Sequence, residues 1–449
     1  MKLVLAMVLA ASPALAQETA DAGVPQTDAG TPEEQALQKE LEQAMAADRA
    51  AAGQGVPAGA TSATPAPLNR GSQSLNPDIS AIIDADLGWW RRPPSFPAGD
   101  DPDLGGDPAT RALGATVQEV ELALSAIVDP YLKGEVYLTI PNLQGIEVEE
   151  AFATTTSLPW NLQARLGSFR SVFGRQNGQH LHVQDFTRRP LINAAFLGAD
   201  GLRGPAGEIS WLVPLPIFLT LYAEAYSLRA GAPLFPAEGD RPANVESFGN
   251  DGGKTPTFVG AAKIFLPLGE ALSLYGGLSV ARGESPGVFL FPDVGLGRGR
   301  ATTLVGGDLY VKWKPPNVAQ GYSSLAWQTE AILRRFDAGD GLDGEWDGGF
   351  YSQVVWQFDR RFFLGLRGEM VGLPSSSVLQ RTVRFGTSLT FQASEFARVR
   401  AYVDYERANL GAGDAVPPGR LYPAVVPSDG PAAFLQLEIS IGAHGAHPF

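Results

Sequence analysis

The sequence predicts an all-β fold, a transmembrane antiparallel β-barrel of about 16 strands. Three observations predict it: apolar and polar residues alternate with period two, the links between the expected strands are sorted by length, and no window after the N-terminus is apolar enough for a spanning helix. Such a helix needs roughly 20 apolar residues. A barrel strand is apolar on one face only, so a barrel resembles a soluble protein in its average hydropathy. The mean hydropathy of −0.03 agrees with a barrel.

The N-terminus has the order of an export signal. A short positive start at Lys2 precedes an apolar run over residues 3–11, and Ala14-Leu15-Ala16 is a small-residue cleavage motif. These are the three parts of a signal peptide. We therefore expect residues 1–16 to be removed and the mature chain to begin at Gln17.

Residues 17–74 are rich in Ala, Gly, Pro, Thr and Gln. A segment of this composition buries too little apolar surface to fold, so we expect a disordered periplasmic tail. Within it, Thr31 as an N-cap and Pro32 at the first helical position predict a short helix near residues 31–49. Its two leucines on one stripe leave two interpretations, a marginal isolated helix or a short trimerising coiled coil.

The barrel is expected in residues 75–449. The alternating segments are residues 78–87, 117–128, 131–140, 146–155, 161–170, 206–213, 217–227, 257–265, 271–282, 301–314, 323–336, 348–358, 362–370, 378–392, 397–407 and 433–441. The links after even-numbered segments are short, and most links after odd-numbered segments are long. Short periplasmic turns alternating with longer external loops are typical of bacterial barrels. We therefore expect the outer membrane of a Gram-negative cell, with both termini in the periplasm.

The facing of side chains within a segment agrees with this fold. In residues 397–407, Val403 and Tyr405 fall on one face, and Arg400 and Asp404 fall on the other. The apolar face should meet lipid, because a charge at the bilayer midplane costs about 2–4 kcal/mol. The polar face should line a lumen that holds water, which favours an open channel over a filled plug. Glu149-Glu150 breaks the alternation and indicates a rim position or a β-bulge.

Some functions are excluded by what the sequence lacks. It has no G-x-S-x-G, H-E-x-x-H or P-loop motif, and the glycines at 295, 297 and 299 precede no expected helix, so we expect no enzyme. The net charge is −14 and the Lys and Arg residues are scattered, whereas a nucleic-acid binder needs a clustered basic face. No disulfide is possible without cysteine.

Ten arginines are candidates for the wall of the constriction. By analogy with channel barrels, the third external link, residues 171–205, is expected to fold into the lumen. The candidates lie in or near this link and on later strands: Arg165, Arg170, Arg175, Arg188, Arg189, Arg203, Arg367, Arg384, Arg398 and Arg400. One interpretation is that they hold anions through fork-shaped hydrogen bonds. The other is an arginine–carboxylate network that pins the loop to the wall, with Glu119, Glu121, Glu135, Glu208, Glu369 and Asp404 as partners.

The same link carries a possible metal site. His180, His182 and Asp185 are close in sequence, and imidazole and carboxylate groups bind zinc. The alternative is a pair of hydrogen-bonded loop histidines. His444 and His447 are expected in the periplasmic tail, so the four histidines cannot form one site. The acidic residues of 337–347 do not match an EF-hand and are expected in a solvated loop, or in one that binds divalent ions loosely.

Several segments together resemble a known family. They are Asn76-Pro77-Asp78-Ile79-Ser80, Glu119–Ser125, Glu149-Glu150-Ala151, Gly167-Ser168-Phe169-Arg170, His180-x-His182 with Asp185-Phe186, Ser210-Trp211-Leu212 and the ending Gly442–Phe449. The set resembles porin-like outer-membrane proteins related to the phosphate-selective porin O/P superfamily, some of which are labelled zinc-regulated TonB-dependent outer membrane receptors. The resemblance implies a porin barrel with a link to zinc. Residues 17–74 are too short for the plug of a TonB-dependent receptor, so we expect passive transport.

The expected function is passive diffusion of small hydrophilic, in particular anionic, solutes. A zinc-linked uptake porin and an outer-membrane anchor or adhesin are the alternatives. The expected partners are outer-membrane lipid, small solutes and the barrel-assembly machinery, which would read the last strand and Phe449. A homotrimer is expected by analogy with general porins, and zinc is the only cofactor considered.

Overall fold

The computed structural model describes most of the barrel. The described residues are 77–91, 101–104, 111–198, 200–228, 247–248, 255–285, 300–336, 345–374, 381–409 and 430–442. Several sequence predictions fall outside them: the export signal (1–16), the tail (17–74) with its helix (31–49), the glycines at 295–299, most of the acidic loop (337–344), His444, His447 and Phe449.

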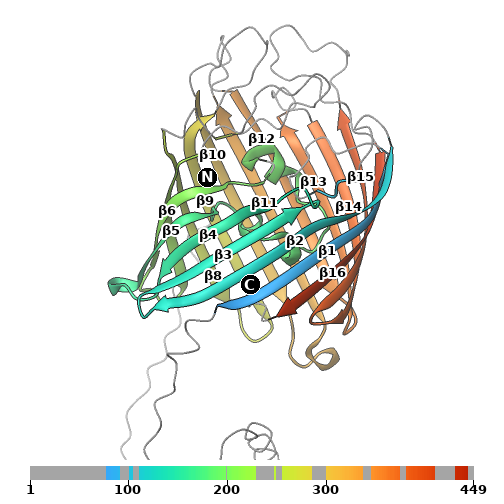
Figure 1. The fold of residues 1–449 in the computed structure, drawn as a ribbon, viewed down its shortest axis with the longest axis horizontal. Helices are drawn as coiled ribbons and strands as arrows, with labels where there is room; N and C mark the ends of the chain where they lie inside the picture. Colours follow the sequence, from blue (N-terminus) through green and yellow to red (C-terminus); the bar gives the residue numbers. More distant parts are fainter. Residues whose placement is uncertain are drawn as a thin grey trace, which may run out of the picture. The chain divides into compact units, whose positions relative to one another are not determined.

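The described residues form a closed antiparallel barrel of sixteen strands (Figure 1). The strands are β1 (Asp78–Trp90), β2 (Ala112–Asp129), β3 (Leu132–Pro141), β4 (Glu147–Thr155), β5 (Leu162–Arg170), β6 (Arg203–Leu212), β7 (Phe218–Tyr226), β8 (Thr257–Pro267), β9 (Leu272–Ser285), β10 (Arg300–Trp313), β11 (Ser324–Phe336), β12 (Glu345–Gln357), β13 (Phe362–Leu373), β14 (Arg381–Ser394), β15 (Ala397–Asn409) and β16 (Gly430–Gly442). Each strand pairs with its neighbour in the chain, and β1 pairs with β16 to close the sheet. The predicted fold class is confirmed.

The sequence located every strand but set some ends too short. The largest difference is at the start of β2, expected at residue 117 and found at Ala112, where Leu113 pairs with Trp89. The hydrogen-bonded pairing of β1 with β2 continues past the segment in which apolar and polar residues alternate regularly. The sorting of links is confirmed: residues 130–131 and 395–396 are short turns, whereas residues 171–202 form a long link.

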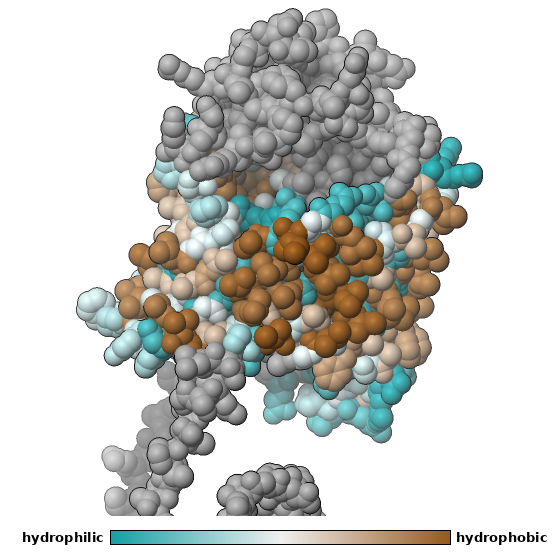
Figure 2. Space-filling model, in the orientation of Figure 1, coloured by the Kyte–Doolittle hydropathy of each residue, from teal (hydrophilic) through white to brown (hydrophobic). Residues whose placement is uncertain are grey.

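The barrel turns its apolar side chains outward. Phe385, Val403 and Tyr405 are about half exposed or more, whereas Arg384 and Asp404 on the same strands are buried. This is the predicted facing, because a barrel wall separates lipid on one side from the lumen on the other. Figure 2 shows the outward apolar residues as a brown band with hydrophilic residues on either side of it.

Short helices lie in the links. They are η1 (Pro159–Asn161), η2 (Gln176–Gly178), η3 (Leu181–Val183), η4 (Asn193–Leu197) and η6 (Ala319–Gly321). Among the segments that the structure describes, no helix has the length and apolar character needed to cross a membrane.

A β-bulge explains the break in alternation at Glu149-Glu150. Tyr137 on β3 lies opposite Glu150, and the next residue, Leu138, lies opposite Val148, so Glu149 is the extra residue of β4. The bulge lets two consecutive side chains point inward, and both glutamates are buried. Of the two interpretations of this pair, the bulge is the one that the structure shows.

Candidate functional site

Between β5 and β6 the chain enters the barrel and forms the inner loop, residues 171–202. Its π-helical turn η4 belongs to the green coil within the strands in Figure 1. Phe173 and Phe196 on this segment are fully buried. The link after the fifth strand therefore lies in the lumen, as the sequence predicted, and the candidate site is this loop together with the wall around it.

One side of the wall, from β8 to β11, holds the start of the inner loop. Glu330 on β11 accepts the backbone N–H groups of Arg175 and Gln176, at 3.1 and 2.7 Å. Lys263 on β8 donates from Nζ to the carbonyl oxygen of Gly174 at 2.8 Å. Side chains of the wall thus bind backbone groups of the loop, so the path of the loop here does not depend on the loop's own side chains.

A second part of the wall, from β13 to β15, holds the loop with arginines. We call Arg367 on β13, Arg384 on β14, and Arg398 and Arg400 on β15 the arginine wall. Each donates an N–H to a loop carbonyl: Arg367 to Arg188 (2.7 Å), Arg400 to Gln184 (2.6 Å), Arg384 to Arg189 and Arg398 to His182. Four guanidinium groups therefore follow the loop backbone over residues 182–189.

Glu369 neutralises part of this wall. Its carboxylate accepts from the Nε of Arg367 and of Arg384, both at 2.8 Å, and from the backbone N–H of Leu191 at 2.6 Å. The side chain of Glu369 is fully buried. One carboxylate thus joins two strands of the wall to the loop.

Arg188 extends the same network from the loop side. Its Nη1 lies 2.8 Å from Asp404 on β15, and its Nε lies 3.3 Å from Asp101. Burial disfavours the charged guanidinium, but Asp404 and Asp101 outweigh that penalty and raise the pKa of Arg188 above its usual value. The guanidinium of Arg188 therefore stays charged although it is buried, because two carboxylates of the protein compensate it.

The remaining candidate arginines also have partners. Three of them contact carboxylates: Arg165 pairs with Glu208 at 2.6 Å, Arg170 donates from Nε to Glu149 at 2.9 Å, and Arg203 lies 3.4 Å from Glu147. Arg189 donates to the carbonyl of Gln179 at 3.2 Å. The guanidinium of Arg175 lies 4.2 Å from the ring centroid of Tyr310. The ten arginines do not form one basic patch, because those on β5 and β6 are separated from the arginine wall by β7 to β12. Of the two sequence interpretations, this geometry is that of a network pinning the loop.

The two loop histidines meet carboxylates on another part of the wall. We call Glu121 on β2 with Glu149 and Glu150 on β4 the acidic wall. The Nδ1 of His180 lies 3.1 Å from Oε2 of Glu121 and 3.1 Å from Oε2 of Glu149. The Nδ1 of His182 lies 3.2 Å from the same oxygen of Glu121. These groups could hold either a proton or a metal ion.

The predicted metal ligand Asp185 is not part of this group. It is exposed, and the donor atoms that lie within 4.8 Å of one another belong to Glu121, Glu149 and His180. The prediction was wrong for Asp185: it follows the turn η3, and closeness in sequence does not bring its carboxylate into the group around His180. Burial disfavours a charged His180, but Glu149 and Glu121 outweigh it and raise the pKa of His180 well above its ordinary value.

Sequence reasoning missed the glutamates as partners of the histidines. The signal that could have found them is the pair Glu149-Glu150 itself. A bulge that turns consecutive carboxylates inward creates a local need for positive charge. The loop segment with the two histidines meets that need.

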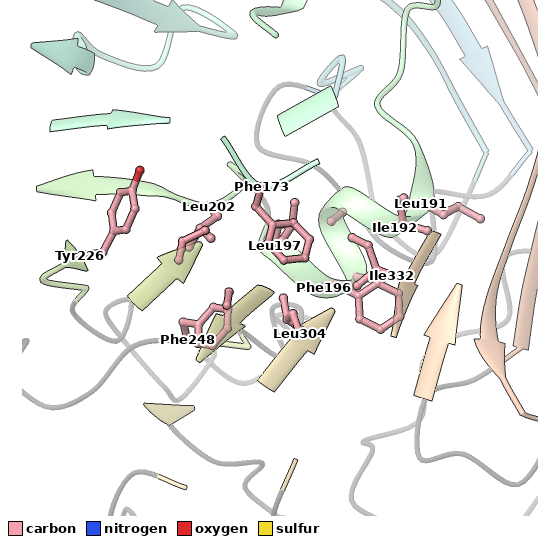
Figure 3. Packing of buried hydrophobic residues seen from close by; sticks show 14 of the residues in the cluster. Phe173, Leu191, Ile192, Phe196, Leu197, Leu202, Tyr226, Phe248, Leu304 and Ile332 are labelled. Atoms are coloured by element: carbon pink, nitrogen blue, oxygen red, sulfur yellow. The ribbon is translucent and has the colours of Figure 1, made fainter. Parts of the chain in front are cut away.

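An apolar cluster inside the barrel was also missed. Leu191, Ile192 and Phe196 of the inner loop pack against Leu304 on β10 and Ile332 on β11 (Figure 3). All five are buried to 3% exposure or less. The expectation of a polar, water-filled lumen is wrong at this level, because apolar side chains occupy inward positions of both strands. Burial of this size stabilises the loop by roughly 1.5–3 kcal/mol for each large side chain.

Comparison with known proteins gives one sequence relative and solved structures of the same fold. No protein-family model matches the chain. An uncharacterized protein of Aquifex aeolicus (strain VF5) is 32% identical in an alignment of 361 residues that covers 75% of this chain and 70% of that protein. The outer membrane channel DcaP of Acinetobacter baumannii has a TM-score of 0.52 and 11% identity over 81% of this chain and 97% of its own. OmpT of Vibrio cholerae, in its trimer form, has a TM-score of 0.51 and 9% identity over 82% and 99%. These structures share the fold of this chain.

Proposed function

The chain belongs to one family with the Aquifex aeolicus protein, and we propose that its function is that of an outer-membrane porin for passive diffusion of small hydrophilic solutes. Catalysis forms no part of this proposal. The observation that carries it is the inner loop, which is anchored across the lumen by β8, β11 and the arginine wall. A loop fixed inside a closed barrel narrows the passage and so limits the size of the solute.

The proposal does not extend to a preference for anions. The guanidinium groups of the arginine wall are bound to loop carbonyls and to carboxylates, so they do not offer free forks to a passing anion. Among the described residues, 14 Asp and Glu side chains are buried against 8 of Lys and Arg. An excess of carboxylates favours cations in the passage, so we expect the channel to prefer cations weakly.

Planar bilayers test this proposal. The purified barrel should give stepwise conductance, and a salt gradient should give a reversal potential with the sign of weak cation preference. A folded barrel that stays silent would refute the porin. A reversal potential of the opposite sign would refute the cation preference alone and return the arginines to the role of an anion filter.

We further propose that the porin is a trimer, since the OmpT structure with this fold has a trimer form. Native mass spectrometry of the detergent-extracted protein tests the mass of the assembly.

Recognition of Phe449 by the barrel-assembly machinery stays a prediction. So does the role of an anchor or adhesin, whose long loops, such as residues 410–429, lie outside the described residues. The zinc-linked alternative is favoured by a specific cluster and is developed below.

A further inference from the structure

The contact of the inner loop with the acidic wall has the composition of a metal site. It brings together one imidazole and two carboxylates, from His180 in the loop, Glu121 on β2 and Glu149 on β4. The donor atoms come from three separate parts of the chain and lie within 4.8 Å of one another. Nitrogen and oxygen donors of these two kinds are the ligands that Zn²⁺ accepts in proteins.

The spacing of the donors suits a tetrahedral ion. Bonds of about 2.0–2.1 Å to a tetrahedral ion separate the ligand atoms by roughly 3.3 Å. The Nδ1 of His180 lies 3.1 Å from each of the two Oε2 atoms, close to the separation that such an ion requires, and the two carboxylate donors lie within 4.8 Å of each other. Three protein ligands leave a fourth position open to water, which is typical of sites that exchange their ligand.

The surroundings hold the ligands in place. The Nε of Arg170 donates to Oε1 of Glu149 at 2.9 Å, which leaves Oε2 directed at His180. His182 contacts Glu121 through the oxygen that also faces His180, and the ring of Tyr137 lies 4.7 Å from the ring of His180. Partners that orient the ligands in this way are a regular part of metal sites.

The local charge balance also favours a cation. Glu121, Glu149 and Glu150 bring three carboxylates, all buried, and Arg170 brings one guanidinium. Buried charges need compensation in a low-dielectric site. A divalent cation bound by neutral imidazole would supply the two positive charges that this group of carboxylates requires.

We propose that Glu121, Glu149 and His180 bind a zinc ion in the lumen. The ion ties the inner loop to β2 and β4, a part of the wall separate from the strands that hold the loop with arginines. The site goes beyond the porin function and does not depend on it, because a barrel can bind zinc whether or not it conducts.

Isothermal titration calorimetry with ZnCl₂ on the chelator-treated full barrel in detergent tests the site. We expect one zinc ion per chain for the wild type. Glu121→Gln and His180→Ala should each weaken binding at least about tenfold, since even changes in outer-shell partners cost about 10- to 100-fold. Gel migration before and after heating checks that each variant is folded. If one of the two variants fails to fold, the other carries the test.

Two controls separate this site from other zinc ligands. Asp185→Asn removes the carboxylate nearest in sequence to the histidines and should bind zinc as the wild type does. The double variant His444→Ala/His447→Ala removes the other two histidines and should also keep the affinity. Wild-type affinity in His180→Ala, or loss of affinity only in the double variant, would overturn the proposal. A barrel that binds zinc but never conducts would refute the porin and leave the zinc site standing.

Discussion

The arginine wall and the acidic wall hold the same loop by opposite means. On β13 to β15, positive side chains of the wall bind backbone carbonyls of the loop, and carboxylates such as Glu369 balance them. On β2 and β4, negative side chains of the wall bind loop histidines; the guanidinium of Arg170 pairs with Glu149, and that of Arg203 lies 3.4 Å from Glu147 at the start of β4.

The difference separates a permanent anchor from an exchangeable one. A guanidinium keeps its charge at every relevant pH, so the charge of the arginine wall does not depend on a bound proton or metal ion. Imidazole gains or loses a proton in the physiological range or binds a metal ion, so the acidic wall depends on what it has bound. The loop is therefore fixed at residues 182–189 and open to regulation at His180.

The largest effect should come from breaking the arginine wall with Glu369→Gln. Both carboxylate oxygens face N–H donors, so a glutamine must turn its own amide N–H groups toward a donor, and the guanidinium groups of Arg367 and Arg384 lose their counter-charge. Breaking a buried pair of this kind costs about 3–5 kcal/mol. Urea unfolding in detergent measures the loss, and single-channel conductance should rise as the loop loosens. Wild-type stability would show that the wall is not an anchor.

A smaller effect is expected for Arg400→Lys, which keeps the charge and removes the fork. Arg400 donates from Nη1 to Gln436 at 2.6 Å and from Nη2 to the carbonyl of Gln184 at 2.6 Å. A lysine ammonium is a single point and cannot reproduce both contacts, so the variant should lose about 1.5–3 kcal/mol, the range for a hydrogen bond to a charged group. The same urea titration measures it. No loss would mean that charge alone, without geometry, holds the loop.

The sequence predicted the wall of the barrel better than its contents. Alternation fixes which face each strand residue occupies, so Arg384, Arg400 and Asp404 were correctly assigned to the lumen side. The strand count followed from the same period together with the sorted links. Local patterns suffice here because each strand pairs with its neighbour in the chain.

The contents of the lumen depend on contacts between residues far apart in sequence. Glu369 meets Leu191, and Glu121 meets His180, across separations that no local pattern records. The sequence offered only Asp185 as a partner for the histidines, since it is the nearest carboxylate in the loop. The sequence did not predict that Leu191 and Phe196 would be buried in the lumen, nor the strands on which they pack.

The smallest effect should come from Glu150→Gln on the acidic wall, the matched counterpart of Glu369→Gln. Glu150 is as buried as its neighbour Glu149, but it accepts the backbone N–H of Arg170, a bond that a glutamine oxygen can keep. Removing its charge also relieves repulsion with Glu149. We therefore expect a stability within about 1 kcal/mol of the wild type, since the hydrogen bond survives.

The zinc affinity of Glu150→Gln should fall less than that of Glu149→Gln, because Glu150 contributes only charge near the ion, whereas Glu149→Gln removes a ligand and leaves the guanidinium of Arg170 uncompensated. Calorimetry and urea unfolding on the two variants separate one carboxylate from the other. If Glu150→Gln cost as much stability as Glu369→Gln, the two walls would be equivalent anchors, and the contrast between a wall of permanent charge and one that binds a cation would be wrong.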